Sequence, residues 1–394
     1  MIKNENWMLP DGVEEILPYE ARKVETLRRR LLDLFQRWGY DLVIPPMMEF
    51  SSTLMAGLGQ DLDKLTYKVV DQISGASMVI RSDMTPQTAR MDAHSLKRLG
   101  LNRLCYSGHV LFTRAKSVLA SRSPLQVGVE LFGEAGLEAD IEVISLLISS
   151  LHEAGLTEFS LDLGHVGIFR ALAEVCQLTS DQEQELFSLL QAKAIADIAD
   201  WVDANIQDPQ HAQWLLELPK LSGSASVLDR ASDLFAEAPI AVRRALDELA
   251  EVAEGLAERY PDVNFYLDLS ELRGGHYHTG IVFAAFALGM GREIASGGRY
   301  DHIGETFGRA RPATGFTADL IDLERLSNVD DVDSFGIFVP YSRDPELWRL
   351  VQQLRQDGER VVCATAQHQE RHDYLSCSRQ LVKVDGAYQI HTLT

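Results

Sequence analysis

Side chains that could bind a small polar ligand gather in residues 271–301, which read ELRGGHYHTGIVFAAFALGMGREIASGGRYD. Two glycine pairs, at 274–275 and 297–298, predict places where the backbone turns tightly or approaches a ligand closely. Hydrogen-bonding groups and flat rings flank the pairs: Arg273, His276, Tyr277, His278, Arg299, Tyr300 and Asp301. Such groups are typical of a small polar-ligand pocket. A glycine-rich hairpin with ordinary surface polar groups is the alternative, but the repeated pattern favours a binding site.

Two histidines in the same stretch could instead bind a metal ion. His276 and His278 are two residues apart, so in a strand they would share one face. With Asp268 or Glu271 as a further ligand, they could hold zinc. The residues alone leave this metal site open beside the polar-ligand pocket.

Further polar side chains occur in two segments far from this stretch. Asp83 and Thr85 lie in SMVIRSDMTPQTAR, which predicts a short strand, a turn and a helix. The pair could contribute to a site, or it could simply cap that helix. Gln126 and Glu130 lie four residues apart in the predicted strand LQVGVELFG, so both side chains point to the same face.

Helices and strands that could position these residues are recognisable along the chain. Apolar residues recur at three- and four-residue spacing through residues 20–38, which predicts an amphipathic helix. A strand over residues 40–44 follows and ends at two prolines. Residues 168–260 have mainly helical patterns, and a capping box at Ser180 and Glu183 would open a helix over residues 182–202.

The end of the chain predicts a separate small lobe. Short strands are expected at 335–339, 360–364, 381–384 and 388–391, with a helix at 346–356. Residues 335–394 contain seven basic and seven acidic side chains, a formal charge of 7 − 7 = 0. A short, neutral lobe is a poor RNA binder.

Composition limits the classes of function. A length of 394 residues allows two or three domains, and the net charge of −21 disfavours general binding to nucleic acid or anionic membranes. The four cysteines are scattered without CxxC or zinc-finger spacing, which indicates free thiols. No signal peptide or long apolar span is recognisable, so the sequence predicts a cytoplasmic protein.

Several motifs resemble those of histidyl-tRNA synthetases. RGGHYHTGIVF resembles their RGLDYYxxTVF signature, SGGRYD resembles GGGRYD, and LQVGVELFG resembles HQIGVEVFG. Residues 20–46, a helix, a strand and proline, resemble class II motif 1, which builds the dimer interface in that family. The resemblance covers about residues 9–326.

This resemblance implies an α+β fold, a class II aminoacyl-tRNA synthetase-like antiparallel sheet flanked by helices. It places the synthetase-like domain at 1–326, a helical insertion at about 168–260 and a small C-terminal α/β lobe at 327–394. In the family, the acid and the threonine at the matching positions contact the α-amino group of histidine. The resemblance favours amino-acid binding over zinc, and it implies a histidine-like pocket built from Asp83, Thr85, Gln126, Glu130, Arg273 and Tyr277.

The sequence departs from the synthetases where ATP is bound. The motif 2 arginine position holds Phe112, and Arg114 occupies the glutamate position. In motif 3, Asp322 occupies the arginine position and Asp319 replaces a glycine, although a shifted alignment could bring in Arg325. Arginines supply charge-assisted contacts to phosphates, whereas a carboxylate repels a triphosphate. We therefore expect no adenylate formation.

With these departures, the sequence resembles the regulatory subunits of ATP phosphoribosyltransferase. The strings DMTPQTARMDAH and LDLGHVGIFRAL resemble that family in particular. That family implies a non-catalytic homodimer, without a cofactor, tRNA or membrane as partner. It would bind and activate the short-form catalytic subunit, which converts ATP and phosphoribosyl pyrophosphate to phosphoribosyl-ATP, and would contribute to feedback inhibition by histidine.

Alternatives remain at this stage. The chain could be a divergent histidyl-tRNA synthetase or a stand-alone histidine:AMP ligase. The stoichiometry of the complex and its binding surface are open, and inhibitory histidine could bind in the pocket, at the subunit interface or on the catalytic partner.

Overall fold

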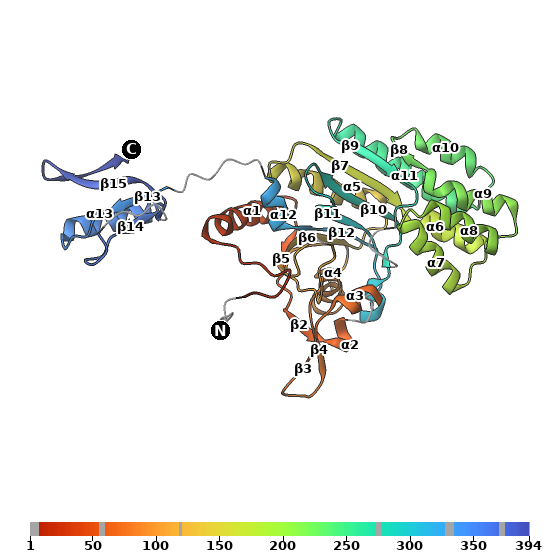
Figure 1. The fold of residues 1–394 in the computed structure, drawn as a ribbon, viewed down its shortest axis with the longest axis horizontal. Helices are drawn as coiled ribbons and strands as arrows, with labels where there is room; N and C mark the ends of the chain where they lie inside the picture. Colours follow the sequence, from red (N-terminus) through yellow and green to blue (C-terminus); the bar gives the residue numbers. More distant parts are fainter. Residues whose placement is uncertain are drawn as a thin grey trace, which may run out of the picture. The chain divides into compact units, whose positions relative to one another are not determined.

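A nine-stranded sheet forms the centre of the first unit of the computed structural model (Figure 1). The structure describes residues 8–54, 60–117, 120–272, 277–327, 335–369 and 375–393, and it divides into units Met1–Asn328 and Val329–Thr394. The strand order is β1-β5-β6-β12-β11-β10-β7-β9-β8. The strands are β1 Asp41–Leu42, β5 Asn102–His109, β6 Leu125–Phe132, β7 Phe159–His165, β8 Ser222–Gly223, β9 Asn264–Asp268, β10 Ile281–Ala287, β11 Ala295–Arg299 and β12 Ala313–Asp319.

The middle of this sheet is antiparallel. Strands β5, β6, β12, β11, β10 and β7 pair in that order with alternating direction, whereas β1 joins β5 and β9 joins β7 in parallel. The predicted strand over 40–44 is shorter than expected. Its ladder to β5 continues as far as the Val43 N–H, which donates to the Cys105 carbonyl at 2.9 Å, and Pro45 lies two residues beyond.

Helices pack against the sheet through apolar faces. Helix α1, Pro18–Arg37, buries Val24, Leu27, Leu31, Leu34 and Phe35, and the Phe35 ring meets Phe316 of β12 edge-on at 6.2 Å. Helix α5, Leu137–Glu153, and helix α12, Leu320–Leu326, contribute buried residues to the same core. None of the helices in the described ranges is both long and apolar enough to cross a bilayer.

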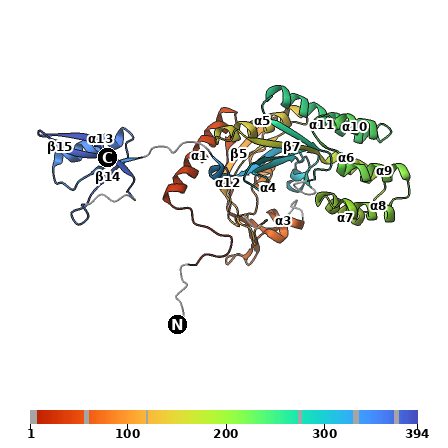
Figure 2. The ribbon, with the colours of Figure 1, turned by 45° about the horizontal axis from the view of Figure 1, so that its top comes forward.

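Six helices follow β7 in the region where the helical insertion is expected. They are α6 Val166–Val175, α7 Ser180–Gln191, α8 Ile195–Asn205, α9 Pro209–Glu217, α10 Val227–Leu234 and α11 Ile240–Arg259, with a 3-10 turn, η2, at Leu218–Lys220. Helices α7, α8 and α9 lie together at one end of this unit in both Figure 1 and Figure 2.

The predicted helix over 182–202 is wrong in two respects. The capping box belongs to Thr179 and Gln182, because the Thr179 hydroxyl accepts from the Gln182 N–H and the Gln182 side chain accepts from the Thr179 N–H. The helix also breaks between α7 and α8, where Lys193 has a left-handed φ of 51°.

A three-stranded sheet and several short helices complete the first unit. The strands β2 Met48–Phe50, β4 Ser77–Ile80 and β3 Lys68–Val70 pair in that order, with α2, Ser51–Leu54, and α3, Gln60–Leu65, beside them in sequence. Helix α4, Thr85–Arg90, continues into the π-helix η1, Met91–Leu96. A second 3-10 turn, η4, covers Ile303–Phe307.

In its described residues, the second unit is a four-stranded sheet beside the helix α13, Pro345–Gln356. The order is β14-β13-β15-β16, from β13 Gly336–Val339, β14 Val361–Cys363, β15 Cys377–Val384 and β16 Ala387–Thr392. Helix α13 contributes Leu347 and Val351 to a small core with β13, β14 and β15.

The four cysteines of the chain are free thiols, as expected.

Candidate functional site

A pocket lies between the first turn of α4, strands β6, β11 and β12, and residues 277–278. We call it the inner pocket, and its lining is Asp83, Thr85, Glu130, Tyr277, His278, Ser296, Gly297, Tyr300, Gly315, Phe316 and Thr317. Four of the six predicted site residues, Asp83, Thr85, Glu130 and Tyr277, therefore meet here. Gln126 lines the adjoining cavity, and Arg273 lies outside the described residues.

The Glu130 carboxylate accepts hydrogen bonds from three hydroxyl groups. Thr85 Oγ1 donates to Oε1 at 2.7 Å, and Tyr106 OH donates to the same oxygen at 3.0 Å. Tyr300 OH donates to Oε2. These donors come from α4, β5 and the end of β11, so the carboxylate is held in one orientation.

The environment of Glu130 changes its acidity. Burial raises the pKa of Glu130 to about 8, and the negative charge of Asp83 adds to this rise, although the hydroxyl donors oppose it. Burial and the charge of Glu130 hold the pKa of Tyr300 well above its usual range, so its hydroxyl remains a donor. Glu130 can therefore be neutral or anionic near neutral pH.

Glycines leave room around this carboxylate. A Cβ on Gly315 would collide with Glu130 Oε2, and a Cβ on Gly297 would collide with the Gly315 carbonyl oxygen. A Cβ on Gly298 would lie 2.7 Å from the Ile281 carbonyl oxygen. The predicted tight turn at 297–298 is wrong, because both glycines lie inside β11. The absence of a side chain there lets the backbones of neighbouring strands approach closely.

Asp83 and Gln126 form a second polar group at the pocket. Asp83 Oδ1 accepts from the Met84 N–H at 2.7 Å, the Thr85 N–H at 3.4 Å and Gln126 Nε2 at 3.4 Å. The capping interpretation is therefore correct in part for Asp83. Gln126 Oε1 is buried and has no hydrogen-bond partner in the part of the chain that the structure describes, so it is ready to accept from a ligand.

Aromatic side chains close another side of the inner pocket. The Tyr277 ring centroid lies 4.3 Å from that of His278 and 6.0 Å from that of Tyr300. Burial, with the charges of Asp83 and Glu130, raises the pKa of Tyr277 far above its usual range.

The proposed zinc ligands include one residue that the structure does not describe and one whose carboxylate already has a partner. His276 lies outside the described residues, and Asp268, one of its suggested partners, accepts from Lys193 Nζ at 2.6 Å. Across the described ranges, no group of three or more histidine, cysteine or acidic residues could hold a metal ion.

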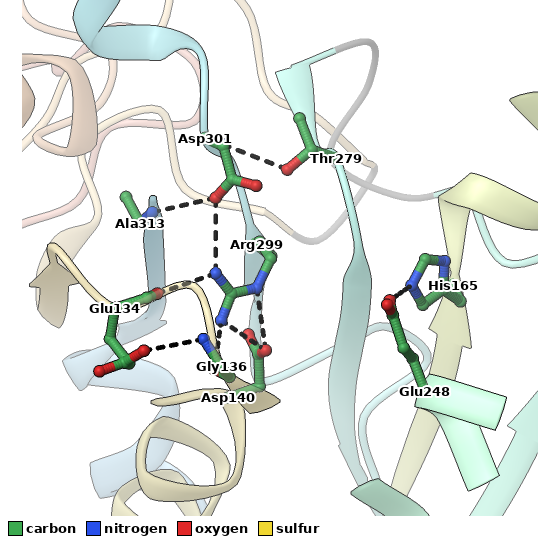
Figure 3. A network of polar contacts seen from close by, with 9 residues as sticks. All are labelled: Glu134, Gly136, Asp140, His165, Glu248, Thr279, Arg299, Asp301 and Ala313. Carbon is green, nitrogen blue, oxygen red and sulfur yellow. Dashed lines mark hydrogen bonds and ion pairs between the residues drawn. The ribbon is translucent and has the colours of Figure 1, made fainter. Parts of the chain in front are cut away.

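Arg299, one of the candidate pocket residues, has a structural role instead (Figure 3). Its guanidinium donates to Asp140 Oδ2 at 2.7 and 2.9 Å and to the carbonyl oxygens of Glu134 and Gly136 at 3.0 Å. Asp301 accepts from the Ala313 N–H at 3.1 Å and so fixes the start of β12. The RYD sequence thus joins α5, β11 and β12 and leaves Tyr300 to face Glu130.

Tyr106, Ser296 and Thr317 were missed as site residues. A signal for Tyr106 exists, because Gly128 lies between Gln126 and Glu130, and a Cβ there would lie 2.7 Å from the Tyr106 hydroxyl. His278, one of the candidate pocket residues, does line the pocket. Ser296 and Thr317 are ordinary strand residues that only the sheet register brings to the site.

The adjoining cavity, which we call the outer cavity, shares Ser296 and Thr317 with the inner pocket. Its other lining residues are Phe112, Lys116, Ala120, Ser121, Pro124, Gln126, Arg292, Glu293, Ile294, Ala295, Ala318 and Asp319. Phe112 is buried here, and Arg292 forms an ion pair with Asp322.

Two aspartates occupy the region that resembles motif 3. Asp319 caps α12 by accepting from the Ile321 N–H at 3.0 Å, and burial, with the charge of Asp322, raises its pKa to about 7. Arg325 does not replace the missing arginine, because it donates to Glu20 at 3.0 Å and to Glu14 at 2.9 Å.

Comparison with known proteins identifies the family. A model described as histidyl-tRNA synthetase matches residues 12–323, and one described as the C-terminal domain of the ATP phosphoribosyltransferase subunit HisZ matches residues 334–391. The ATP phosphoribosyltransferase regulatory subunit of Teredinibacter turnerae is 56% identical over 394 residues, 100% of both chains. That of Saccharophagus degradans is 55% identical over 97% of both chains. The chain belongs to the family of ATP phosphoribosyltransferase regulatory subunits.

This regulatory-subunit family acts in histidine biosynthesis, and solved structures of similar proteins share the fold described above. An ATP phosphoribosyltransferase regulatory subunit/histidyl-tRNA synthetase from Bacillus halodurans is 28% identical and has a TM-score of 0.82, over 94% of this chain and 96% of that one. A histidyl-tRNA synthetase from Nostoc, 19% identical, has a TM-score of 0.78 over 98% and 97% of the two chains and bears on the fold alone. The predicted synthetase-like fold and the predicted family are confirmed.

Proposed function

We propose that this chain is a non-catalytic subunit that binds and activates the short form of ATP phosphoribosyltransferase, and that its inner pocket binds histidine during feedback inhibition. The observation that carries the proposal is the 56% identity to a regulatory subunit over the whole of both chains. The catalytic partner would supply the chemistry, and this chain would need no cofactor.

The inner pocket has the donors and acceptors that histidine requires. The Glu130 carboxyl suits an imidazole N–H, and the Tyr277 and His278 rings suit the flat face of that ring. Asp83 and the free acceptor Gln126 Oε1 suit the α-amino group. A pocket that orients its ligand through buried polar groups rejects apolar analogues, because they leave those groups unpaired.

The outer cavity is poorly suited to the triphosphate of ATP. Asp319 lines it, and its one described arginine, Arg292, is neutralised by Asp322. Loss of a single transition-state donor lowers a rate by roughly 10²–10³-fold. This arrangement, and a net charge of −21 that repels RNA, support a subunit without aminoacylation activity or tRNA binding.

A homodimer is part of the proposal. Apolar side chains are exposed in and after β1, the region that resembles motif 1: Leu42, Ile44, Met47, Met48 and Phe50. Ile44 is 83% exposed, and an apolar group of this size on a soluble protein indicates an interaction surface. Ile44→Lys should lower the sedimentation coefficient from the value of a dimer to that of a monomer. Ile240→Lys, at the exposed start of α11, should leave the coefficient unchanged. Monomeric wild-type protein would contradict the dimer.

Assembly with the catalytic subunit gives the main test. The two purified proteins should elute together from a sizing column, and the phosphoribosyltransferase rate should rise when this chain is added. Histidine should inhibit the complex, and Glu130→Gln should weaken that inhibition. Separate elution with an unchanged rate would refute the proposal.

A second test addresses the synthetase and ligase alternatives. The isolated chain should give no histidine-dependent pyrophosphate–ATP exchange above a control without enzyme. A clear exchange signal would show that the chain activates histidine and is an enzyme in its own right.

A further inference from the structure

A zwitterionic ligand in the inner pocket needs a cation for its carboxylate. The inner pocket itself presents two carboxyl groups, Asp83 and Glu130, and they suit the amino group and the imidazole. A ligand bound in this way directs its carboxylate past Gln126, because Gln126 hydrogen-bonds to Asp83 and also lines the outer cavity. The described cations that line the outer cavity are Lys116 and Arg292.

These two cations differ in availability. Arg292 forms an ion pair with the largely buried carboxylate of Asp322. The Lys116 ammonium lies 4.5 Å from the centroid of the Phe112 ring, and within the described ranges it has no hydrogen bond or ion pair. Lys116 is exposed, so it can move from the ring to a ligand at little cost.

Lys116 is also close enough to influence the inner pocket. Burial raises the pKa of Asp83, and the positive charge of Lys116 is the main effect that opposes this rise. The ammonium is thus electrostatically coupled to the carboxylate that faces the ligand's amino group.

We propose that Lys116 binds the α-carboxylate of the amino acid in the inner pocket and so makes the site selective for amino acids over the corresponding amines. This inference rests on the proposed function, since it assumes that the pocket binds histidine. An ammonium–carboxylate contact is a charge-assisted hydrogen bond, and its loss at a partly exposed position should lower affinity about tenfold.

Calorimetry with histidine and histamine, which lacks the carboxylate, tests this role. The wild-type chain should bind histidine more tightly than histamine. Lys116→Met should weaken histidine binding about tenfold without weakening histamine binding, and Lys116→Arg should restore most of the difference. Arg114→Met is the matched control, because Arg114 is an exposed cation on the same loop that does not line the cavity.

The outcomes separate this inference from the proposed function. If the wild-type chain binds histidine and Lys116→Met keeps the full preference over histamine, the carboxylate is held elsewhere and the Lys116 role is wrong. If Lys116→Met weakens the binding of histidine and histamine equally, the lysine acts through the overall electrostatic potential of the pocket. Its proposed role in selectivity is then also wrong. If the wild-type chain binds neither ligand, alone or with the catalytic subunit, the histidine pocket itself is refuted, and the Lys116 role with it.

Discussion

Glu130 combines burial, with 1% of its surface exposed, with three hydroxyl donors. Its pKa is raised from 4.5 to about 8, so between these values the folded state holds a proton that the unfolded state has released. The folded state is therefore favoured at low pH, and this contribution is lost as pH rises from about 4.5 to 8.

Glu130→Gln should remove this part of the pH dependence. Between pH 5 and 8, the free energy of unfolding of the wild-type chain should fall by at least about 1 kcal/mol relative to the variant. Urea denaturation at several pH values gives the slope of unfolding free energy against pH for each protein. A pH-independent loss of stability from the rearranged Tyr300 hydrogen bond does not change these slopes. Parallel profiles would show that the Glu130 pKa is not raised.

Gly315 should tolerate no side chain. Gly315→Ala would drive a Cβ into Glu130 Oε2 and the Val129 carbonyl, and overpacking of this kind costs about 1–3 kcal/mol. Gly291→Ala is the control, because a Cβ there meets nothing within 4 Å. Denaturant unfolding should show the loss for the first variant alone, and equal stability of both variants would contradict the packing argument.

Part of the site is predictable from residue spacing. Gln126 and Glu130 share a face because they are four apart in a strand, and Asp83 and Thr85 are linked by one short turn. The contact of Tyr300 with Glu130 is not predictable in this way, since it depends on the register that places Gly298 opposite Gly315. The structural role of Arg299 likewise depends on Asp140, which lies 159 residues away.

At the scale of elements, Lys193 ties the helical region to the sheet. It lies at the break between α7 and α8, and its ammonium contacts Asp268 at 2.6 and 2.8 Å and Ser270 Oγ at 2.6 Å. Asp268 is the last residue of β9, and Ser270 follows shortly after it. The contact therefore fixes the break between α7 and α8 against the end of β9.

Lys193→Met should lower the free energy of unfolding by about 1–2 kcal/mol, since it removes charge-assisted hydrogen bonds to a mostly buried carboxylate. Lys220→Met, which breaks an exposed pair with Glu217 three residues away, should cost at most about 0.5 kcal/mol. Urea denaturation compares the two variants. Equal losses would mean that Lys193 is no more than a surface lysine.

The same lysine shows why some elements escape prediction. Helix α1 and strand β10 follow apolar patterns that the sequence displays directly. The α7–α8 break has no glycine or proline, and a left-handed lysine is held by a carboxylate 75 residues away. Long-range contacts of this kind leave no local signal.

At the scale of the whole molecule, every described residue of the inner pocket belongs to the first unit. A fragment of residues 1–327 should therefore fold cooperatively and bind histidine within about twofold of the full chain, as calorimetry would measure. Glu130→Gln should weaken binding by the same factor in both lengths. A loss of tenfold or more in the fragment would show that the second unit contributes to the site.

The ion pair between Arg292 and Asp322 also limits which substitutions the two positions can accept. An arginine at position 322, as in synthetase motif 3, would face the guanidinium of Arg292 and remove its carboxylate partner. A change at Arg292 alone would leave Asp322, which is 5% exposed, as a buried charge without its counter-ion. Each single substitution should therefore lower the free energy of unfolding, so an arginine at position 322 would be tolerated only if position 292 changed with it.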